Sequence, residues 1–223
     1  MIKYTQDQLR EIIQQNINGE ESKDSTIVIT RKNNIFVVNK TTIEAVLDMN
    51  SKSIGVLNMA SNKRKGGGVL NGAVAQEEDL YRCTNMYNLV SDDFYPLDNK
   101  ILFTEDVKVI RDSNYMYLQD PVNINVITSC MVNLNTTKAR PIDYHQVVEN
   151  KIEELLQGFL KYQCTSIVLG AWGCGVFKNK PEDIAKAFYR VLMKGYRHCF
   201  DEIIFAIAFN EKNYNVFRDQ FIR

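Results

Sequence analysis

Short aliphatic and β-branched runs alternate along the chain with longer segments in which apolar residues recur every three or four positions. The runs at Ile54–Met59, Asn123–Ser129 and Thr165–Leu169 have the composition of buried strands. The clearest amphipathic segment is Asp143–Tyr162, which carries one continuous apolar face and predicts a helix. Strands alternating with helices at this spacing predict an α/β sandwich whose sheet is mixed and parallel at its centre.

The same patterns predict further elements around these runs. An N-terminal extension, residues 1–25, is expected to be helical and to pack on a domain formed by residues 26–223. Asn179, with Glu182 three residues later, is typical of a helix start. The remaining predicted elements are a helix at Thr5–Asn18, a hairpin of Thr26–Thr30 with Ile35–Val38, a helix from Asn39 to Asn50 capped by Thr41 or Thr42, a helix from Asn71 to Leu89, strands at Ile101–Thr104 and Val107–Ile110, a helix from Pro181 to Lys194, a strand at Asp201–Phe209 and a helix at Asn213–Arg223.

Two glycine-rich loops each follow a predicted strand and precede a predicted helix. Gly66–Gly68 follows Ile54–Met59, and the second loop runs from Gly170 to Gly175 after Thr165–Leu169. Side-chain-free turns let the backbone approach a ligand, and a helix N-terminus behind such a turn suits a phosphate. In α/β sheets ligands bind at the carboxyl ends of strands, so we expect both loops to border one site.

Seven residues separate Gly68 from an amide and two carboxylates that follow one another as Gln76, Glu77 and Glu78. Neighbouring residues on a helix point about 100° apart, so the two carboxylates are expected to serve different purposes. An acidic pair on a helix is more often a solvated surface feature, and a glycine triplet alone is more often a simple loop. The residues alone leave both interpretations open.

Composition narrows the classes of function. Lys plus Arg and Asp plus Glu both number 27, which argues against a general nucleic-acid binder but leaves room for a local basic patch at Lys63, Arg64 and Lys65. Five cysteines without a Cys-x-x-Cys pair, and only two histidines, support a zinc site poorly, so no metal and no cofactor is expected. Reduced thiols and the lack of a long apolar run predict a soluble cytoplasmic protein.

Two strings resemble a known enzyme family. NMASNKRKGGGVLNGAVAQEEDLYR, from Asn58 to Arg82, resembles the signature of the microbial poly(ADP-ribose) glycohydrolases, with Met59 for the usual Phe and Lys65 for the usual Pro. GAWGCGVFKNKPEDIAKAF, from Gly170 to Phe188, resembles the second phosphate loop of that family and of macrodomains generally. The resemblance extends from about Thr26 to Phe217 and implies a macrodomain-like, three-layer α/β/α sandwich.

The resemblance implies hydrolysis of the ribose–ribose O-glycosidic bonds of poly(ADP-ribose), with ADP-ribose as the product ligand. Glu78 would be the catalytic carboxyl, and Glu77 would hold ribose hydroxyls and keep its neighbour partly protonated. Asn58 and Gln76 would donate neutral hydrogen bonds to the riboses, and Phe177 would pack by the terminal ribose. The implied substrate-binding residues are Asn58, Gly66, Gly67, Gly68, Val69, Gln76, Gly170, Gly173, Cys174, Gly175, Val176 and Phe177.

Several alternatives remain open at this stage. The same carboxylates could remove single ADP-ribosyl groups from protein, nucleic acid or a small nucleotide, or the domain could bind ADP-ribose without cleaving it. Residues 91–120 could close over the leaving group and decide the substrate. Cys174 near a helix start could be a nucleophile, but neither His145 nor His198 has a visible role as its base. We expect a monomer that acts on poly(ADP-ribose) or ADP-ribosylated macromolecules and not on membranes.

Overall fold

Six strands form one sheet in the computed structural model, which describes residues 34–136 and 140–222. Their order across the sheet is β1-β6-β5-β2-β4-β3, and all neighbours are parallel except the antiparallel pair β3 and β4. This confirms the mixed, centrally parallel sheet expected from the sequence. The strands are β1 (Ile35–Val38), β2 (Ile54–Met59), β3 (Leu102–Arg111), β4 (Tyr117–Ser129), β5 (Ser166–Leu169) and β6 (Glu202–Ala206).

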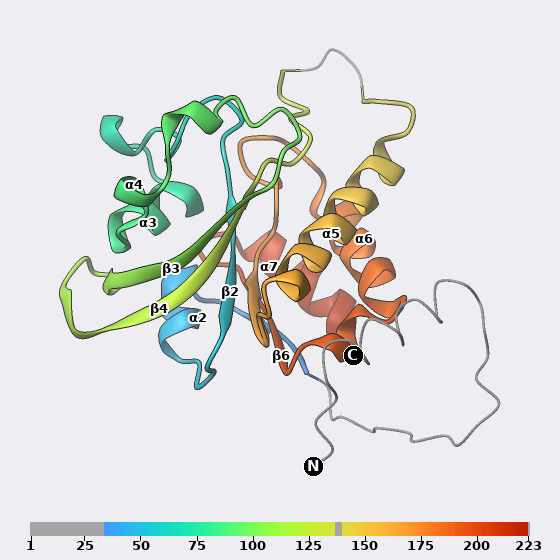
Figure 1. Cartoon of the computed structure of the whole chain (residues 1–223). Coiled ribbons are helices and arrows are strands. Elements are labelled where there is room, and N and C mark those ends of the chain that lie inside the picture. Colours follow the sequence, from blue (N-terminus) through green and yellow to red (C-terminus); the bar gives the residue numbers. More distant parts are fainter. Residues whose placement is uncertain (1–33, 137–139, 223) are drawn as a thin grey trace.

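Helices cover both faces of the sheet, with α3 and α4 on one side and α5 and α6 on the other (Figure 1). Successive side chains of a strand enter different apolar clusters: in β6, Ile203 and Phe205 belong to one, and Ile204 and Ala206 to the other. The result is the expected three-layer sandwich. The helices are α2 (Thr42–Leu47), α3 (Gln76–Cys83), α4 (Met86–Leu89), α5 (Tyr144–Lys161), α6 (Pro181–Met193) and α7 (Glu211–Phe221).

Strand β2 and helix α5 have nearly the predicted bounds, because their apolar patterns are unambiguous. The two short strands predicted between residues 101 and 110 are one strand, β3, whose register against β4 shifts between Thr104 and Val107. An irregular pairing of this kind interrupts the alternation of inward-facing and outward-facing side chains. The sequence pattern therefore looks like two strands separated by a loop.

The helix predicted from Asn71 to Leu89 is wrong at its start and in its continuity. Only one 3₁₀ turn, Val69–Asn71, follows the glycines, and Gly72 then takes a left-handed conformation with φ 74° that ends the turn. The α-helix begins at Gln76, and it ends before Thr84, which is extended and bridges to Val109 of β3. The two carboxylates therefore lie in the first turn of α3, and the first glycine loop has no α-helix N-terminus directly behind it.

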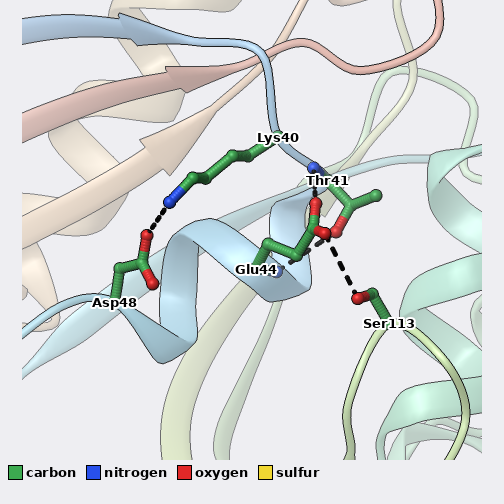
Figure 2. A network of polar contacts seen from close by, with 5 residues as sticks. All are labelled: Lys40, Thr41, Glu44, Asp48 and Ser113. Carbon is green, nitrogen blue, oxygen red and sulfur yellow. Dashed lines mark hydrogen bonds and ion pairs between the residues drawn. The ribbon is translucent and has the colours of Figure 1, made fainter.

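Helix α2 begins with the capping arrangement that its sequence predicts (Figure 2). The Thr41 hydroxyl accepts a hydrogen bond from the Glu44 amide, and the Glu44 carboxylate accepts one from the Thr41 amide at 2.7 Å. The other Glu44 oxygen accepts a hydrogen bond from Ser113 in the turn between β3 and β4. Lys40 pairs with Asp48 at the other end of the helix. The start of α2 is thus held by its own cap and by the β3–β4 turn.

Some predicted elements lie outside the described residues. These are the extension of residues 1–25 with its helix at Thr5–Asn18, and the strand at Thr26–Thr30. Ile35–Val38 is a strand as predicted and is parallel to β6, while its pairing with Thr26–Thr30 stays a prediction. Among the helices of the described ranges, none combines the length and the apolar character needed to cross a membrane.

Candidate active site

Both glycine loops lie at the edge of the sheet where the central parallel strands end. Met59 at the end of β2 is in register with Ser129 at the end of β4. Gly170 follows β5, and a Cβ added to it would lie 2.9 Å from the Met59 methyl carbon. The ends of β5, β2 and β4 therefore bring the two loops together, as the sequence predicts.

The Gln76 side chain closes the gap where β2 parts from β5. These strands are in register only as far as Val56. Beyond it, Gln76 Oε1 accepts a hydrogen bond from the Met59 amide at 2.9 Å, and Nε2 donates to the Leu57 carbonyl at 2.8 Å and to Thr42 Oγ1 at 3.2 Å. The amide is bonded within the protein, so its role here is to brace the strand that leads into the site, whereas the sequence suggested a ribose contact.

Glu77 is almost fully buried and hydrogen-bonded on both oxygens. Its Oε2 accepts from the Ser61 amide at 2.7 Å, and its Oε1 faces Asn58 Nδ2 at 3.5 Å. Asn58 is itself fully buried and also donates to Thr128 Oγ1, so its amide nitrogen fixes the carboxylate, while its Oδ1 is buried without a partner among the described residues. Burial raises the pKa of Glu77 to about 7, opposed by the hydrogen bond from Ser61. A neutral Glu77 is consequently well populated near pH 7.

Glu78 has a different environment. Its Oε1 accepts a hydrogen bond from the Gly68 amide at 2.8 Å, while its Oε2 is buried and has no hydrogen-bond partner among the described residues. A buried carboxylate oxygen without a partner is uncommon in folded proteins, and a ligand or water that reached this oxygen would satisfy it. Of the adjacent pair, Glu78 is the carboxylate with a free oxygen.

The first glycine loop lies directly on these two carboxylates. Gly67 has φ 56°, and a Cβ on it would lie 2.5 Å from Glu78 Oε1 and 2.8 Å from Glu77 Oε2. The Gly68 amide hydrogen-bonds to Glu78 and the Gly67 amide to the Arg64 carbonyl, while the Gly66 backbone opposes the rise in the pKa of Glu77. This loop therefore packs against the acidic pair and helps to hold it, whereas the sequence suggested that the loop binds the pyrophosphate. The carboxyl group with the raised pKa is Glu77, whereas the sequence suggested that Glu77 would keep its neighbour Glu78 partly protonated.

Asn179 fixes the second glycine loop and was not recognised from the sequence as part of the site. Its Nδ2 donates to the carbonyls of Val132 and Gly173, and its Oδ1 accepts from the Tyr144 hydroxyl at 2.6 Å. The predicted capping box with Glu182 is wrong: the N-cap of α6 is Lys180, without a side-chain hydrogen bond. Local rules predict a cap from an asparagine shortly before a proline, while two of its three partners, Val132 and Tyr144, are distant in sequence.

The outer part of the second loop is open. Gly175 and Val176 are exposed, and a Cβ on Gly175 would meet no atom within 4 Å. No hydrogen bond found among the described residues has the amide of Gly175, Val176 or Phe177 as its donor. Successive unengaged amides in a glycine turn suit an anion such as a phosphate.

Phe177 connects the two loops. It is half-buried and packs against the cluster of Ala60, Leu97 and Cys130, in which Ala60 directly follows β2. Its carbonyl accepts a hydrogen bond from the Leu134 amide. The ring thus lies between the second loop and the segment that holds Glu77, which agrees with a place beside the reacting ribose and equally with a packing role.

Two other residues of the second loop are explained by packing. Trp172 is 1% exposed and belongs to the core, so the structure supports a packing role for it. Burial raises the pKa of the Cys174 thiol to about 12. A neutral thiol is a poor nucleophile, so the structure gives the cysteine-nucleophile hypothesis no support.

Phe209 is a candidate ligand contact that the sequence reasoning missed. It lies in the connection from β6 to α7, at the same edge of the sheet as the glycine loops, and its side chain is 96% exposed. Its φ of 59° is rare for a bulky residue. An aromatic residue three positions after the end of β6 and directly before the Asn210 cap was the signal available in the sequence.

Within residues 34–136 and 140–222, no three or more His, Cys, Asp or Glu side chains gather in a way that could hold a metal ion. The expectation of a metal-free site concerns the whole chain and its chemistry, so it stays a prediction.

Comparison with known proteins assigns the family. The model of the microbial-type PARG catalytic domain, where PARG denotes poly(ADP-ribose) glycohydrolase, matches residues 3–116. Two crystal structures of PARG from Deinococcus radiodurans in complex with ADP-ribose are similar: one is 27% identical with TM-score 0.79, covering 97% of this chain and 91% of that one, and the other 26% identical with TM-score 0.77, covering 97% and 92%.

PARG from Thermomonospora curvata shares the fold at 24% identity, with TM-score 0.80, over 98% of this chain and 84% of that one. Among curated proteins none matches. The family match spans half of the chain, and it includes the first glycine loop and the acidic pair whose geometry is described above. The chain belongs to the family of microbial-type PARG catalytic domains.

Proposed function

We propose that this protein is a poly(ADP-ribose) glycohydrolase, which hydrolyses the O-glycosidic bonds between ADP-ribose units and so reverses ADP-ribosylation. Family membership supports this activity, and the observation that carries it is the state of Glu78. One of its oxygens is fixed by the Gly68 amide, and the other is buried without a partner among the described residues. Solved structures of similar PARG enzymes hold ADP-ribose or the inhibitor ADP-HPD.

In the proposed reaction Glu78 is the acid and base. Its free oxygen would protonate the departing ribose oxygen and then accept a proton from the attacking water, as an oxocarbenium-like transition state requires. Glu77, with a pKa of about 7, would accept or donate a hydrogen bond to ribose hydroxyls beside it. Asn58 and Gln76 would act through the protein, by fixing Glu77 and the end of β2.

The rest of ADP-ribose is assigned to the open parts of the same edge. The free amides of Gly175 and its two successors would bind the pyrophosphate, and Phe177 would pack by the terminal ribose. The exposed ring of Phe209 offers a flat apolar face to the adenine. Gly170, Gly173, Cys174 and Val69 support this surface through loop shape and packing.

Further aspects of the proposal concern the protein as a whole. We infer a cytoplasmic monomer composed of an extension of residues 1–25 and a catalytic domain of residues 26–223.

The reaction is proposed to need no metal, since both carboxylates are assigned to proton transfer and ribose binding. Release of ADP-ribose should therefore continue in excess chelator. Loss of release, restored by one divalent ion, would require Glu77 or Glu78 to be reassigned as a ligand.

The test compares two substrates. Purified protein is incubated with poly(ADP-ribose) and, separately, with a mono-ADP-ribosylated protein, and free ADP-ribose is measured over time. Release from the polymer is expected. Release from the mono-ADP-ribosylated protein alone would leave the site in place and overturn the polymer as substrate, and binding of ADP-ribose without release from either would indicate a non-catalytic reader.

A further inference from the structure

Two exposed features flank the glycine loop that holds the catalytic carboxylates, and the proposed reaction does not use either. The basic string before the loop contributes Lys63 and Arg64, which are exposed and form no ion pair with any described residue. The segment after the loop contributes Leu70 and Val74, whose side chains are 78% and 84% exposed. One flank is thus cationic and the other apolar.

The basic flank is held in place by its neighbours. Lys65 turns inward: its side chain is 9% exposed, its Nζ donates to the Val90 carbonyl at 2.9 Å, and it lies 3.3 Å from Asp92. Asn62 accepts hydrogen bonds from the amides of Leu97 and Asp98. The backbone that carries the exposed pair is therefore held on both sides.

Nearby anions are already occupied. Asp92 pairs with Lys65, and an Asp98 oxygen accepts from the Asn62 amide group at 3.4 Å. Asp93 accepts from the Ser91 hydroxyl. None of these carboxylates forms an ion pair with Lys63 or Arg64 among the described residues, so the two outer cations are available to another anion.

The apolar flank is ordered as well. The Arg82 guanidinium donates to the Ala73 carbonyl, and a Cβ on Gly68 would lie 2.6 Å from the Ala73 methyl. The loop from Val69 to Ala75 is therefore anchored at its middle, although Leu70 and Val74 on either side of that anchor face solvent.

Position and chemistry together indicate an occupant. The Ser61 amide binds Glu77, the Lys63 amide donates to the Ser61 hydroxyl, and the Arg64 carbonyl accepts from Gly67, which touches both carboxylates. The flanks are thus next to the bond-breaking groups. In the polymer, the leaving group of the proposed reaction is the preceding ADP-ribose unit, which carries a purine with two apolar faces and a doubly charged pyrophosphate.

We propose that Lys63 and Arg64 bind the pyrophosphate, and Leu70 and Val74 the base, of the ADP-ribose unit on the leaving side of the scissile bond. This inference rests on the proposed function. It makes the surface around Gly66–Gly68 the part of the enzyme that distinguishes a polymer from a single ADP-ribosyl group.

The test is steady-state kinetics on size-fractionated poly(ADP-ribose), with calorimetry of ADP-ribose binding beside it. The double variant Lys63→Gln/Arg64→Gln should raise KM for the polymer about tenfold at low salt, because two phosphate contacts are lost, and should weaken the salt dependence of KM. The double variant Leu70→Ser/Val74→Ser should also raise KM for the polymer. ADP-ribose affinity should stay within about twofold, since phosphate contacts act on the unit they touch. The matched control Lys52→Gln/Lys161→Gln removes two exposed lysines at the opposite edge of the sheet.

An unchanged KM in both double variants, with normal wild-type cleavage, would overturn this subsite and leave the proposed function standing. A parallel loss of ADP-ribose affinity would also overturn it, because the residues would then hold the product unit. A wild type that releases nothing from the polymer would overturn the proposed function and this inference together.

Discussion

Glu77 and Glu78 are adjacent in sequence, yet the protein surrounds them differently. Glu77 receives hydrogen bonds on both oxygens and has a pKa of about 7 because it is buried. Glu78 keeps one oxygen without a described partner. The difference supports the proposed division, in which Glu77 positions the ribose and Glu78 transfers the proton, and this division is the one that the family resemblance implies.

Stability should depend on pH through Glu77. Its folded pKa of about 7 lies above the ordinary 4.5, so the folded state holds a proton that the unfolded chain releases between these values. Raising the pH from 5 to 8 should therefore destabilise the wild type, by up to about 3 kcal/mol from this group. Glu77→Gln cannot ionise, so its free energy of unfolding should rise relative to the wild type over that interval. Urea unfolding of both proteins at pH 5 and 8 measures this, and a constant difference would contradict the pKa assignment.

At the residue scale, sequence reasoning identified the acidic pair and misjudged the neighbouring amides. Gln76 braces β2 because β5 departs from that strand after Val56, and Asn58 contacts Glu77 across the α3–sheet interface. Both facts depend on which segments become neighbours in three dimensions. No local pattern contains that information.

At the scale of elements, the two glycine loops turn out to do different work. In the first loop, the Gly68 amide binds the Glu78 carboxylate. The second loop is held by Asn179, and its outer amides form no hydrogen bond among the described residues. The sequence predicted both loops because glycine triplets after apolar runs are distinctive. It mispredicted residues 71–75 as helix because Ala73 and Ala75 favour helices, while Gly72 adopts a left-handed turn that only the tertiary structure fixes.

Substitution by alanine should have different effects at two glycines of the second loop, lowering stability at one and ligand affinity at the other. Gly173 has φ 78° and a Cβ there would lie 2.6 Å from the Asn179 side chain, so Gly173→Ala should destabilise the protein by about 1–3 kcal/mol. Gly175→Ala meets no protein atom, so it should keep the melting temperature while weakening ADP-ribose binding about tenfold if the pyrophosphate lies on that backbone. Thermal melts and calorimetry separate the effects. Undiminished ADP-ribose affinity in Gly175→Ala would place the pyrophosphate elsewhere.

At the scale of the whole molecule, the site is formed at one edge of the sheet, where the central strands end. The ends of β5, β2 and β4 carry the loops, and the end of β6 adds Phe209. The order of strands and helices was predictable, since α5 and β2 have strong periodicities. The contribution of β6 was not, because an exposed phenylalanine after a strand looks like any surface residue until the strand order places it beside the loops.

Phe209→Ala should weaken ADP-ribose binding about tenfold, the scale of one base–aromatic stack, without lowering the melting temperature, because the ring is 96% exposed. The control Tyr117→Ala removes an exposed aromatic side chain at the opposite end of β4. Calorimetry with ADP-ribose and with ribose 5-phosphate measures the effect, and only ADP-ribose should be affected. An equal loss for both ligands would show that the ring does not contact the base.

The most direct test of the account is the turnover of poly(ADP-ribose) by Glu78→Gln, measured as release of ADP-ribose beside the affinity for ADP-ribose. An amide cannot transfer the proton, so the rate should fall by about 10²–10⁴. The amide still fits the space and keeps an acceptor for the Gly68 amide, so affinity should stay within about tenfold. Glu77→Gln, in contrast, should impair both. Wild-type turnover by Glu78→Gln would contradict the assignment of Glu78 as the group that breaks the bond.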